Sequence, residues 1–296
     1  MTVVGCSVPE RFVNPLFEVF EGGDFVLTSY RDIEQDETEL RIYFPDPADA
    51  PAAIAAIKAA AAIVGVQVAC ETRSLPDEDW KFSYRRHFKT DLVSPRLAIV
   101  PEWEKDAWIT ASPDADAPKA VFLDPGLAFG TGQHATTRAC LVYTDRLAAE
   151  NPCRSYLDVG CGSGILALAA CRVGFREVAG FDIDPDAVAA ANENAARNGL
   201  GIAFVRGDLC NLSTLPGVAR TGDRQFDVVV ANVLGPVLVR FAKEIAALVV
   251  PGGELILSGI LDEIYHEVRD AYAARGFVEQ DSILDGEWRT GLFKRT

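Results

Sequence analysis

A glycine-rich turn between an apolar strand and a helix carries the clearest chemical signal in this sequence. The segment Tyr156-Leu-Asp-Val-Gly-Cys-Gly-Ser-Gly164 places glycines at 160, 162 and 164. Glycine lets the backbone turn tightly and approach a ligand with no Cβ in the way. The N-terminus of the following helix offers free N–H groups to an anionic ligand group. The pattern therefore predicts a cofactor site at the end of this strand.

The glycine spacing separates two cofactor classes. A dinucleotide fingerprint needs G-x-G-x-x-G, and Ile165 stands where its third glycine belongs. The observed spacing, with Asp158 two residues before the first glycine, is typical of a loop that receives S-adenosylmethionine. We expect Gly160 and Gly162 to line that site and Asp158 to meet the cofactor's ammonium, directly or through water. A glycine-rich turn without a ligand is the alternative.

Acidic side chains follow the next two expected strands. Asp182, in Gly180-Phe-Asp-Ile-Asp-Pro185, ends the second strand 22 residues after the first loop glycine. A carboxylate there can accept both hydroxyl protons of a ribose. Its alternative role is to cap the following helix, which is the role that we expect for Asp184. Asp208 follows the third strand, where it either meets an adenine amino group or forms a plain turn.

An amide and a histidine complete the set of candidate polar groups. Asn232 follows the strand Phe226–Ala231, expected beside the glycine-loop strand at the topological switch point of the sheet. Its carbonyl can orient an incoming amine toward a sulfonium methyl, and a loop turn is the alternative. The glycine-rich segment Asp124–Arg138 leads into a helix with Thr136 and Thr137 in its opening region, and a threonine hydroxyl there can bond the cofactor's carboxylate. His134 can act as a base for the amine, although a lone histidine is more often structural.

Composition and charge exclude several function classes. The formal net charge of −15 gives a surface that repels phosphate backbones, so bare nucleic acid is not expected as the main target. The same charge favours a basic protein as partner. The seven cysteines are widely spread without Cys-x-x-Cys spacing, which argues against disulfides and a zinc site and favours a reducing cytoplasm. No nucleophile triad is visible. The apolar stretch Ala52–Cys70 reads as helix then strand, not as a membrane span.

The order of expected elements divides the chain into three parts. Residues 1–75 follow the β-α-β-β-α-β order of a ferredoxin-like unit. Residues 76–118 are expected to form a connecting helix and a linker, and residues 119–296 alternate strands and helices in a parallel, doubly wound sheet. The hairpin signal Asp285-Gly286 adds an antiparallel final strand, as in one class of methyltransferases. We therefore expect an α/β, Rossmann-like, seven-stranded class I methyltransferase fold behind a small α+β domain.

These motifs give the chain a specific resemblance to the PrmA family of methyltransferases, which act on ribosomal large-subunit protein eleven. Asp124–Thr137 matches the family's Asp-Pro-Gly-x-Ala-Phe-Gly-Thr-Gly-x-His-x-Thr-Thr segment, Asp158–Leu166 its glycine loop, and Asp182–Pro185 its Asp-Ile-Asp-Pro. Similar shorter motifs are Asp79-Trp80, Val100-Pro101-x-Trp103, Asn198-Gly199, Ser258-Gly259-Ile260 and Glu287-Trp288. Relatives usually read Asn-[Ile/Leu]-Leu-Ala where this chain has Asn232-Val-Leu-Gly235.

The resemblance implies methyl transfer from S-adenosylmethionine to amines of ribosomal large-subunit protein eleven: lysine side chains and an N-terminal amine. It places cofactor contacts on Thr137, Gly160, Asp182 and Asn232, and substrate docking on the N-terminal module. One alternative is a lysine methyltransferase of another protein, such as the electron-transfer flavoprotein β-subunit, whose enzymes lack that module. A nicotinamide oxidoreductase and a non-catalytic ribosome assembly factor are further alternatives. The glycine spacing argues against the oxidoreductase, and the intact motifs argue against the assembly factor.

Overall fold

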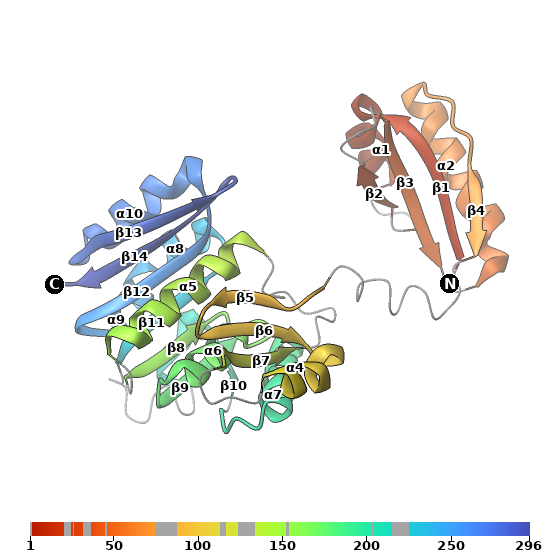
Figure 1. Cartoon of the computed structure of the whole chain (residues 1–296). Coiled ribbons are helices and arrows are strands. Elements are labelled where there is room, and N and C mark those ends of the chain that lie inside the picture. Colours follow the sequence, from red (N-terminus) through yellow and green to blue (C-terminus); the bar gives the residue numbers. More distant parts are fainter. Residues whose placement is uncertain are drawn as a thin grey trace. The chain divides into compact units, whose positions relative to one another are not determined.

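The chain divides into two compact units, as shown by a computed structural model of the whole chain. The structure describes residues 2–20, 25, 27–31, 37–44, 46–74, 88–112, 117–123, 134–151, 154–202, 204–214 and 225–296. The units are Met1–His87 and Phe88–Thr296, and each has its own hydrophobic core (Figure 1).

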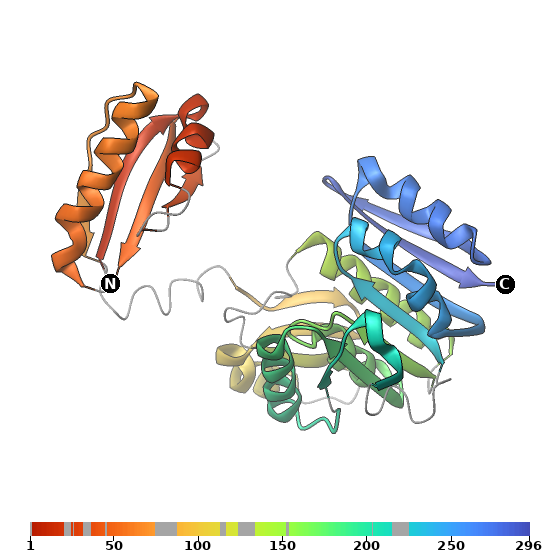
Figure 2. The same cartoon turned by 180° about the vertical axis from the view of Figure 1, so that it is seen from behind.

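The N-terminal unit is a four-stranded antiparallel sheet with two helices. Its elements are β1 (Thr2–Pro9), a 3-10 turn (Glu10–Phe12), α1 (Val13–Phe20), β2 (Leu27–Arg31), β3 (Glu37–Phe44), a 3-10 turn (Pro47–Asp49), α2 (Ala50–Val64) and β4 (Glu71–Ser74). The strand order is β2-β3-β1-β4, with antiparallel pairing throughout. Both helices cover one face of the sheet (Figure 2). This arrangement confirms the expected ferredoxin-like unit.

Helix α2 shows how the sequence builds this unit. Prolines stand just ahead of and inside its first turn, and Gly65 ends it in a left-handed conformation with φ of 76°. Its buried positions Ala50, Ala53 and Ile57 recur at helical spacing and pack on the sheet. Among the described residues, the stretch Pro47–Val64 has the length and composition to cross a membrane. Of this stretch, 22% is buried, which places one face of α2 in the small core.

The second unit is built from alternating strands and helices. Its elements are β5 (Asp91–Ser94), β6 (Leu97–Pro101), a 3-10 turn (Glu102–Glu104), α4 (Lys105–Ala111), β7 (Lys119–Leu123), α5 (Ala135–Glu150), β8 (Ser155–Val159), α6 (Ile165–Val173), β9 (Glu177–Asp182), α7 (Pro185–Arg197), β10 (Phe204–Arg206), a 3-10 segment (Leu209–Thr214), β11 (Phe226–Asn232), α8 (Gly235–Arg240), α9 (Ala242–Ala247), β12 (Val249–Leu261), a 3-10 turn (Asp262–Ile264), α10 (Tyr265–Ala273), β13 (Phe277–Asp285) and β14 (Trp288–Arg295).

The main sheet has the order β10-β9-β8-β11-β12-β14-β13. The pairs from β10 to β12 are parallel, and β14 runs antiparallel to both of its neighbours. Helices α5, α6 and α7 pack in the core on one face of this sheet, and α8, α9 and α10 in the core on the other (Figures 1 and 2). The seven-stranded α/β fold with an antiparallel final strand is thereby confirmed.

A smaller sheet, β5-β6-β7, packs on the outer side of α5 and α6. Two of its strands come from residues 76–118, where the sequence predicts a connecting helix and linker. Phe88 and the residues after it therefore belong to the same compact unit as the main sheet. The helix expected over Pro76–His87 lies outside the described residues. Where the chain divides functionally stays a prediction.

Candidate active site

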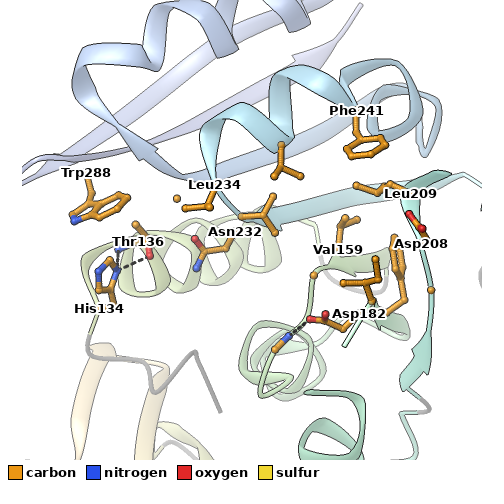
Figure 3. Close-up of a pocket in the computed structure, with 18 residues that line it drawn as sticks. His134, Thr136, Val159, Asp182, Asp208, Leu209, Asn232, Leu234, Phe241 and Trp288 are labelled. Carbon is orange, nitrogen blue, oxygen red and sulfur yellow. Dashed lines mark hydrogen bonds between the residues drawn. The ribbon is translucent and has the colours of Figure 1, made fainter. Parts of the chain in front are cut away.

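A cavity of about 750 Å³ lies at the carboxyl ends of β8, β9 and β11 (Figure 3). This is the edge of a parallel sheet at which ligands bind in doubly wound folds. Its walls come from the loops after β8 to β12, from α8 and Phe241, and from the starts of α5 and β14. The lining residues are His134, Thr136, Val159, Gly160, Gly162, Phe181, Asp182, Ile183, Gly207, Asp208, Leu209, Asn232, Val233, Leu234, Val237, Phe241, Gly259 and Trp288.

The glycine loop forms the floor of the cavity beside β8. Gly160, Gly162 and Gly164 have φ of 70°, 51° and 78°, in the left-handed region that glycine adopts without strain. A Cβ at Gly160 would lie 2.6 Å from Cγ1 of Val233, so a larger residue does not fit there. The backbone N–H of Gly160 donates to the carbonyl of Phe181 at 2.9 Å, which ties the loop to β9.

Asp182 joins the glycine loop to the turn after β9. Its Oδ2 accepts from the backbone N–H of Gly162 at 2.9 Å, and its Oδ1 accepts from that of Asp184 at 3.0 Å. The carboxylate also lines the cavity, where its remaining lone pairs can accept further protons. Asp184 is the N-cap of α7 and accepts from the N–H of Asp186 at 2.9 Å, which confirms its expected cap role.

Asp208 lines the same end of the cavity, surrounded by apolar side chains. Its Oδ1 accepts from the N–H of Cys210 at 2.8 Å, so the residue forms a turn as well as a polar point on the wall. Phe181, Ile183 and Leu209 line this end with it. The result is a flat apolar slot with two carboxylates at its margin (Figure 3).

Asn232 lies at the last position of β11, between the glycine loop and the start of α5. Its Nδ2 donates one N–H to Oγ1 of Thr137 at 3.3 Å, which fixes the plane of the amide, and its carbonyl oxygen is the acceptor that this side chain can offer to the cavity. Thr137 is 1% exposed and does not line the cavity, whereas its neighbour Thr136 does. The structure therefore places Thr137 behind Asn232 and not on the wall.

His134 is the N-cap of α5. Its Nδ1 lies 2.8 Å from Oγ1 of Thr136 and accepts from the Thr136 N–H at 3.4 Å. Its ring packs edge-on against Trp288 of β14, with 5.2 Å between ring centroids. The two side chains form an aromatic wall at the end of the cavity away from Asp182 and Asp208 (Figure 3).

Asp158 differs from its expected position. It is 1% exposed and lies beneath the glycine loop, not on the cavity wall. Its Oδ2 accepts from the N–H of Ala167 at 3.2 Å, while its Oδ1 has no partner. Burial raises the pKa of the Asp158 carboxyl to about 7, and the nearby charge of Asp182 contributes to the rise. A direct contact between Asp158 and a ligand in the cavity is not what this structure shows.

Gly235 stands where relatives usually have alanine, and a local contact explains the glycine. A Cβ at this buried position would lie 2.7 Å from Cδ1 of Ile264, so the isoleucine fills the space that an alanine methyl needs. The substitution leaves Asn232 at the end of β11, and the polar group that the motif supplies is kept.

Sequence reasoning missed most of the apolar wall. Ile183 and Leu209 each directly follow a carboxylate of the predicted site, and Leu234 follows Asn232 by two residues. Their position after strand ends was a usable signal. Phe241, directly after α8, gave no local signal, whereas Trp288 of β14 belongs to the Glu287-Trp288 motif of the resemblance but was not assigned to the site. The segment Asp124–Gln133, predicted to be part of the site, lies outside the described residues.

S-adenosylmethionine fits the residues that are present. Gly160 and Gly162 line the cavity, where they present backbone without a side chain, and Asp182 lines it where a ribose can be bound. The apolar slot beside Asp208 suits an adenine ring. Beneath the loop, the buried Oδ1 of Asp158 has no hydrogen-bond partner among the described residues, and a cationic ligand above it would favour the ionised carboxylate.

Comparisons with known proteins agree with this arrangement. The family model for ribosomal protein L11 methyltransferase (PrmA) matches residues 18–296. The ribosomal protein L11 methyltransferase of Geobacter sulfurreducens is 42% identical, over 98% of this chain and 97% of its own length, and that of Trichlorobacter lovleyi is 36% identical over 99% and 97%. The crystal structure of ribosomal protein L11 methylase from Lactobacillus delbrueckii subsp. bulgaricus superposes with a TM-score of 0.59 at 33% identity, covering 71% of this chain and 100% of that one. The chain therefore belongs to the PrmA family of S-adenosylmethionine-dependent methyltransferases.

Proposed function

We propose that this enzyme transfers methyl groups from S-adenosylmethionine to amines of ribosomal protein L11, on lysine side chains and at the N-terminus. The observation that carries the proposal is the position of Asn232. Its carbonyl lies in one cavity between an acidic, apolar end and an aromatic end, and its NH2 group is held by Thr137. The names of the relatives support ribosomal protein L11 as the substrate.

At the acidic end we assign the cofactor contacts. Asp182 accepts the ribose hydroxyl protons, and Asp208 accepts from the adenine amino group. Gly160 and Gly162 let the backbone approach the cofactor. Asn232 is the fifth contact, at the boundary with the substrate. Thr137 supports the cofactor site through Asn232, because its hydroxyl accepts from that amide and the residue is 1% exposed.

At the aromatic end we assign the amine. The bound cofactor supplies a methyl group already activated by its sulfonium, so the protein's task is to position the two partners. The Asn232 carbonyl accepts an N–H of the substrate amine and aims the nitrogen lone pair. An amine attacks only when neutral, and the apolar surfaces of Leu234 and Trp288 lower the pKa of an ammonium by desolvation.

His134 is the proton acceptor that the sequence suggests, and we keep this role as a proposal. Its Nδ1 accepts from the Thr136 N–H, so the neutral ring carries its own proton on Nε2, and uptake of the amine's proton falls to Nδ1 with loss of the α5 cap. The alternative route is direct loss of the proton to water, with His134 acting as part of the aromatic wall.

The net charge of the chain supports a basic protein as the substrate. The chain's net charge of −15 suits a basic ribosomal protein and disfavours bare nucleic acid as the target. We propose that Met1–His87 docks the substrate, that the reaction runs in the cytoplasm, and that no membrane takes part.

The test is methyl transfer from labelled S-adenosylmethionine to purified ribosomal protein L11, compared with the electron-transfer flavoprotein β-subunit as acceptor. We expect label on L11 that is lost in Asp182→Ala. Tight cofactor binding without label on L11 would contradict the substrate assignment. Label on the flavoprotein subunit alone would transfer the assignment to the alternative enzyme class, and absence of cofactor binding would favour the assembly factor.

A further inference from the structure

Val233 lies between Gly160 and Gly259. Atoms of Val233 lie so close to both glycines that neither has space for a side chain. On one side, a Cβ at Gly259 would lie 2.4 Å from the Val233 carbonyl oxygen and 2.8 Å from its carbonyl carbon. On the other side, a Cβ at Gly160 would lie 2.6 Å from Val233 Cγ1. The residue directly after Asn232 therefore has no free space toward either neighbouring strand.

The topology explains this contact. Strand β11 lies between β8 and β12, and Asn232 pairs with Ser258 of β12. Gly160 directly follows β8, and Gly259 directly follows Ser258. The pairing of β12 with β14 shifts its register between Leu257 and Ile260, and Gly259 has φ of 79° within this irregularity.

The β12 side of the contact is anchored. Ser258 is 0% exposed, its hydroxyl donates to the Thr136 carbonyl at 3.2 Å, and it lies 2.6 Å from the hydroxyl of Thr290. These bonds fix the irregular segment to α5 and β14. Because Ser258 is fixed, added bulk at Gly259 must displace Val233 and not β12.

We propose that the contact among Gly160, Val233 and Gly259 sets the spacing between the cofactor loop and the Asn232 carbonyl. Val233 is thus a positioning residue for methyl transfer, acting through Asn232 on one side and through Gly160 on the other. This inference rests on the proposed function for the role of Asn232, whereas its effect on the cofactor loop does not depend on that role.

The contact has two separable consequences. A Cβ at Gly259 meets backbone atoms, which cannot rotate away as a flexible side chain can, so Val233 must move toward Gly160. That movement presses Cγ1 into the glycine loop and weakens cofactor binding. It also displaces Asn232, and a shift of about 1 Å at a catalytic group lowers the rate by about 100-fold.

The matched pair of variants is Gly259→Ala and Gly252→Ala. Gly252 lies on the same strand with φ of 77°, and a Cβ there would meet nothing within 4 Å. Both variants carry the same left-handed strain, and Gly259→Ala alone adds the collision with Val233. Calorimetric binding of S-adenosylmethionine and single-turnover transfer to ribosomal protein L11 separate the two effects.

We expect Gly259→Ala to weaken cofactor binding about 10-fold and to slow transfer about 100-fold, with Gly252→Ala close to the parent. Adding Val233→Ala to Gly259→Ala removes the pressure on Gly160, so cofactor binding recovers while transfer stays slow. This recovery also shows that the Gly259→Ala protein is folded. Equal behaviour of the two glycine variants would overturn the inference, as would a double variant without recovery of binding.

Asn232→Ala measured in parallel separates a failure of this inference from a failure of the proposed function. If Asn232→Ala keeps its rate, the carbonyl role is wrong, and the difference in cofactor binding between the two glycine variants still decides the contact. If Asn232→Ala is inactive and the glycine variants are alike, the contact inference alone is wrong. Val233→Ala alone must lower the transfer rate without lowering the melting temperature by more than Gly252→Ala does.

Discussion

The two ends of the cavity are held in different ways. At the acidic end, Asp182 and Asp208 are each fixed by backbone N–H groups within their own or the adjoining loop. At the aromatic end, His134 is held at its base by the cap contact with Thr136, and its ring packs against Trp288, a residue more than 150 positions away in the chain. Local turns thus build the cofactor side, and long-range packing builds the side assigned to the substrate. Substitutions at the two ends should therefore affect different measured quantities.

The largest effect is expected from Asp182→Ala. The variant removes two backbone hydrogen bonds to a charged acceptor and the proposed ribose contact. The two backbone bonds act on the stability of the loop, whereas each of the two proposed ribose bonds to the charged carboxylate contributes about 1.5–3 kcal/mol to binding, so the affinity for S-adenosylmethionine should fall by about 100-fold or more. Calorimetric titration measures it, with the exposed Asp186→Ala as control. Similar affinities for the two variants would contradict the assignment.

Trp288→Ala tests the aromatic end. The variant removes the ring against His134 and the apolar surface that desolvates the amine. We expect transfer to ribosomal protein L11 to fall by about 10- to 100-fold, with cofactor affinity changed by no more than about 2-fold. Steady-state kinetics with cofactor titration measures both. If cofactor affinity falls as much as the transfer rate, the two ends are not separate.

The buried carboxyl of Asp158, beneath the glycine loop, should make the stability of the protein depend on pH. Its pKa is about 7 in the folded protein against an ordinary value of 3.8, so the folded state binds the proton more tightly. The stability that this proton contributes is present below about pH 3.8 and is lost as the pH rises through about 7. Between about pH 5 and 8, the wild type should lose about 1 kcal/mol or more relative to Asp158→Asn. Denaturant unfolding of the cofactor-free protein measures the free energy of unfolding at each pH. The same pH dependence in the wild type and in Asp158→Asn would refute this prediction.

The smallest effect is expected from Asp184→Ala, which lies two residues from Asp182. Asp184 caps α7 and does not line the cavity. Loss of such a cap costs about 1 kcal/mol of stability, and cofactor affinity should change by less than about 2-fold. Thermal unfolding and calorimetry test the two statements together. A large loss of affinity would mean that the turn after β9 acts as one unit with Asp182.

The difference between the two ends also explains what the sequence could predict. The glycine loop, Asp182, Asp208 and Asn232 all follow strands at positions that the alternation of elements defines, and all four lie on the cavity. The ferredoxin-like order of elements in the first unit and the seven-stranded, doubly wound class of the main sheet followed from the same alternation and from the family resemblance. These features depend on local geometry and on the fixed handedness of the crossovers.

The remaining features depend on contacts between distant segments. The burial of Thr137 behind Asn232 and the pairing of His134 with Trp288 join α5 to β11 and β14. The small sheet β5-β6-β7 forms because β6 pairs with β7 across a helix and linker. No spacing within a single segment encodes these contacts. The depth of Asp158 beneath its loop is equally a property of packing, since its place in the motif resembles that of an exposed ligand.

The role of the Asn232 carbonyl in aiming the amine is tested most directly by measuring cofactor binding and methyl transfer separately. Asn232→Ala, with Thr137→Val as the variant that frees the amide without removing it, is measured for cofactor affinity and for single-turnover transfer to ribosomal protein L11. The account predicts that Asn232→Ala binds S-adenosylmethionine within about 5-fold of the parent and transfers methyl groups about 100-fold more slowly, with Thr137→Val between the two. Transfer at the parental rate by Asn232→Ala would contradict the account, because the amine would then be aimed without the Asn232 carbonyl.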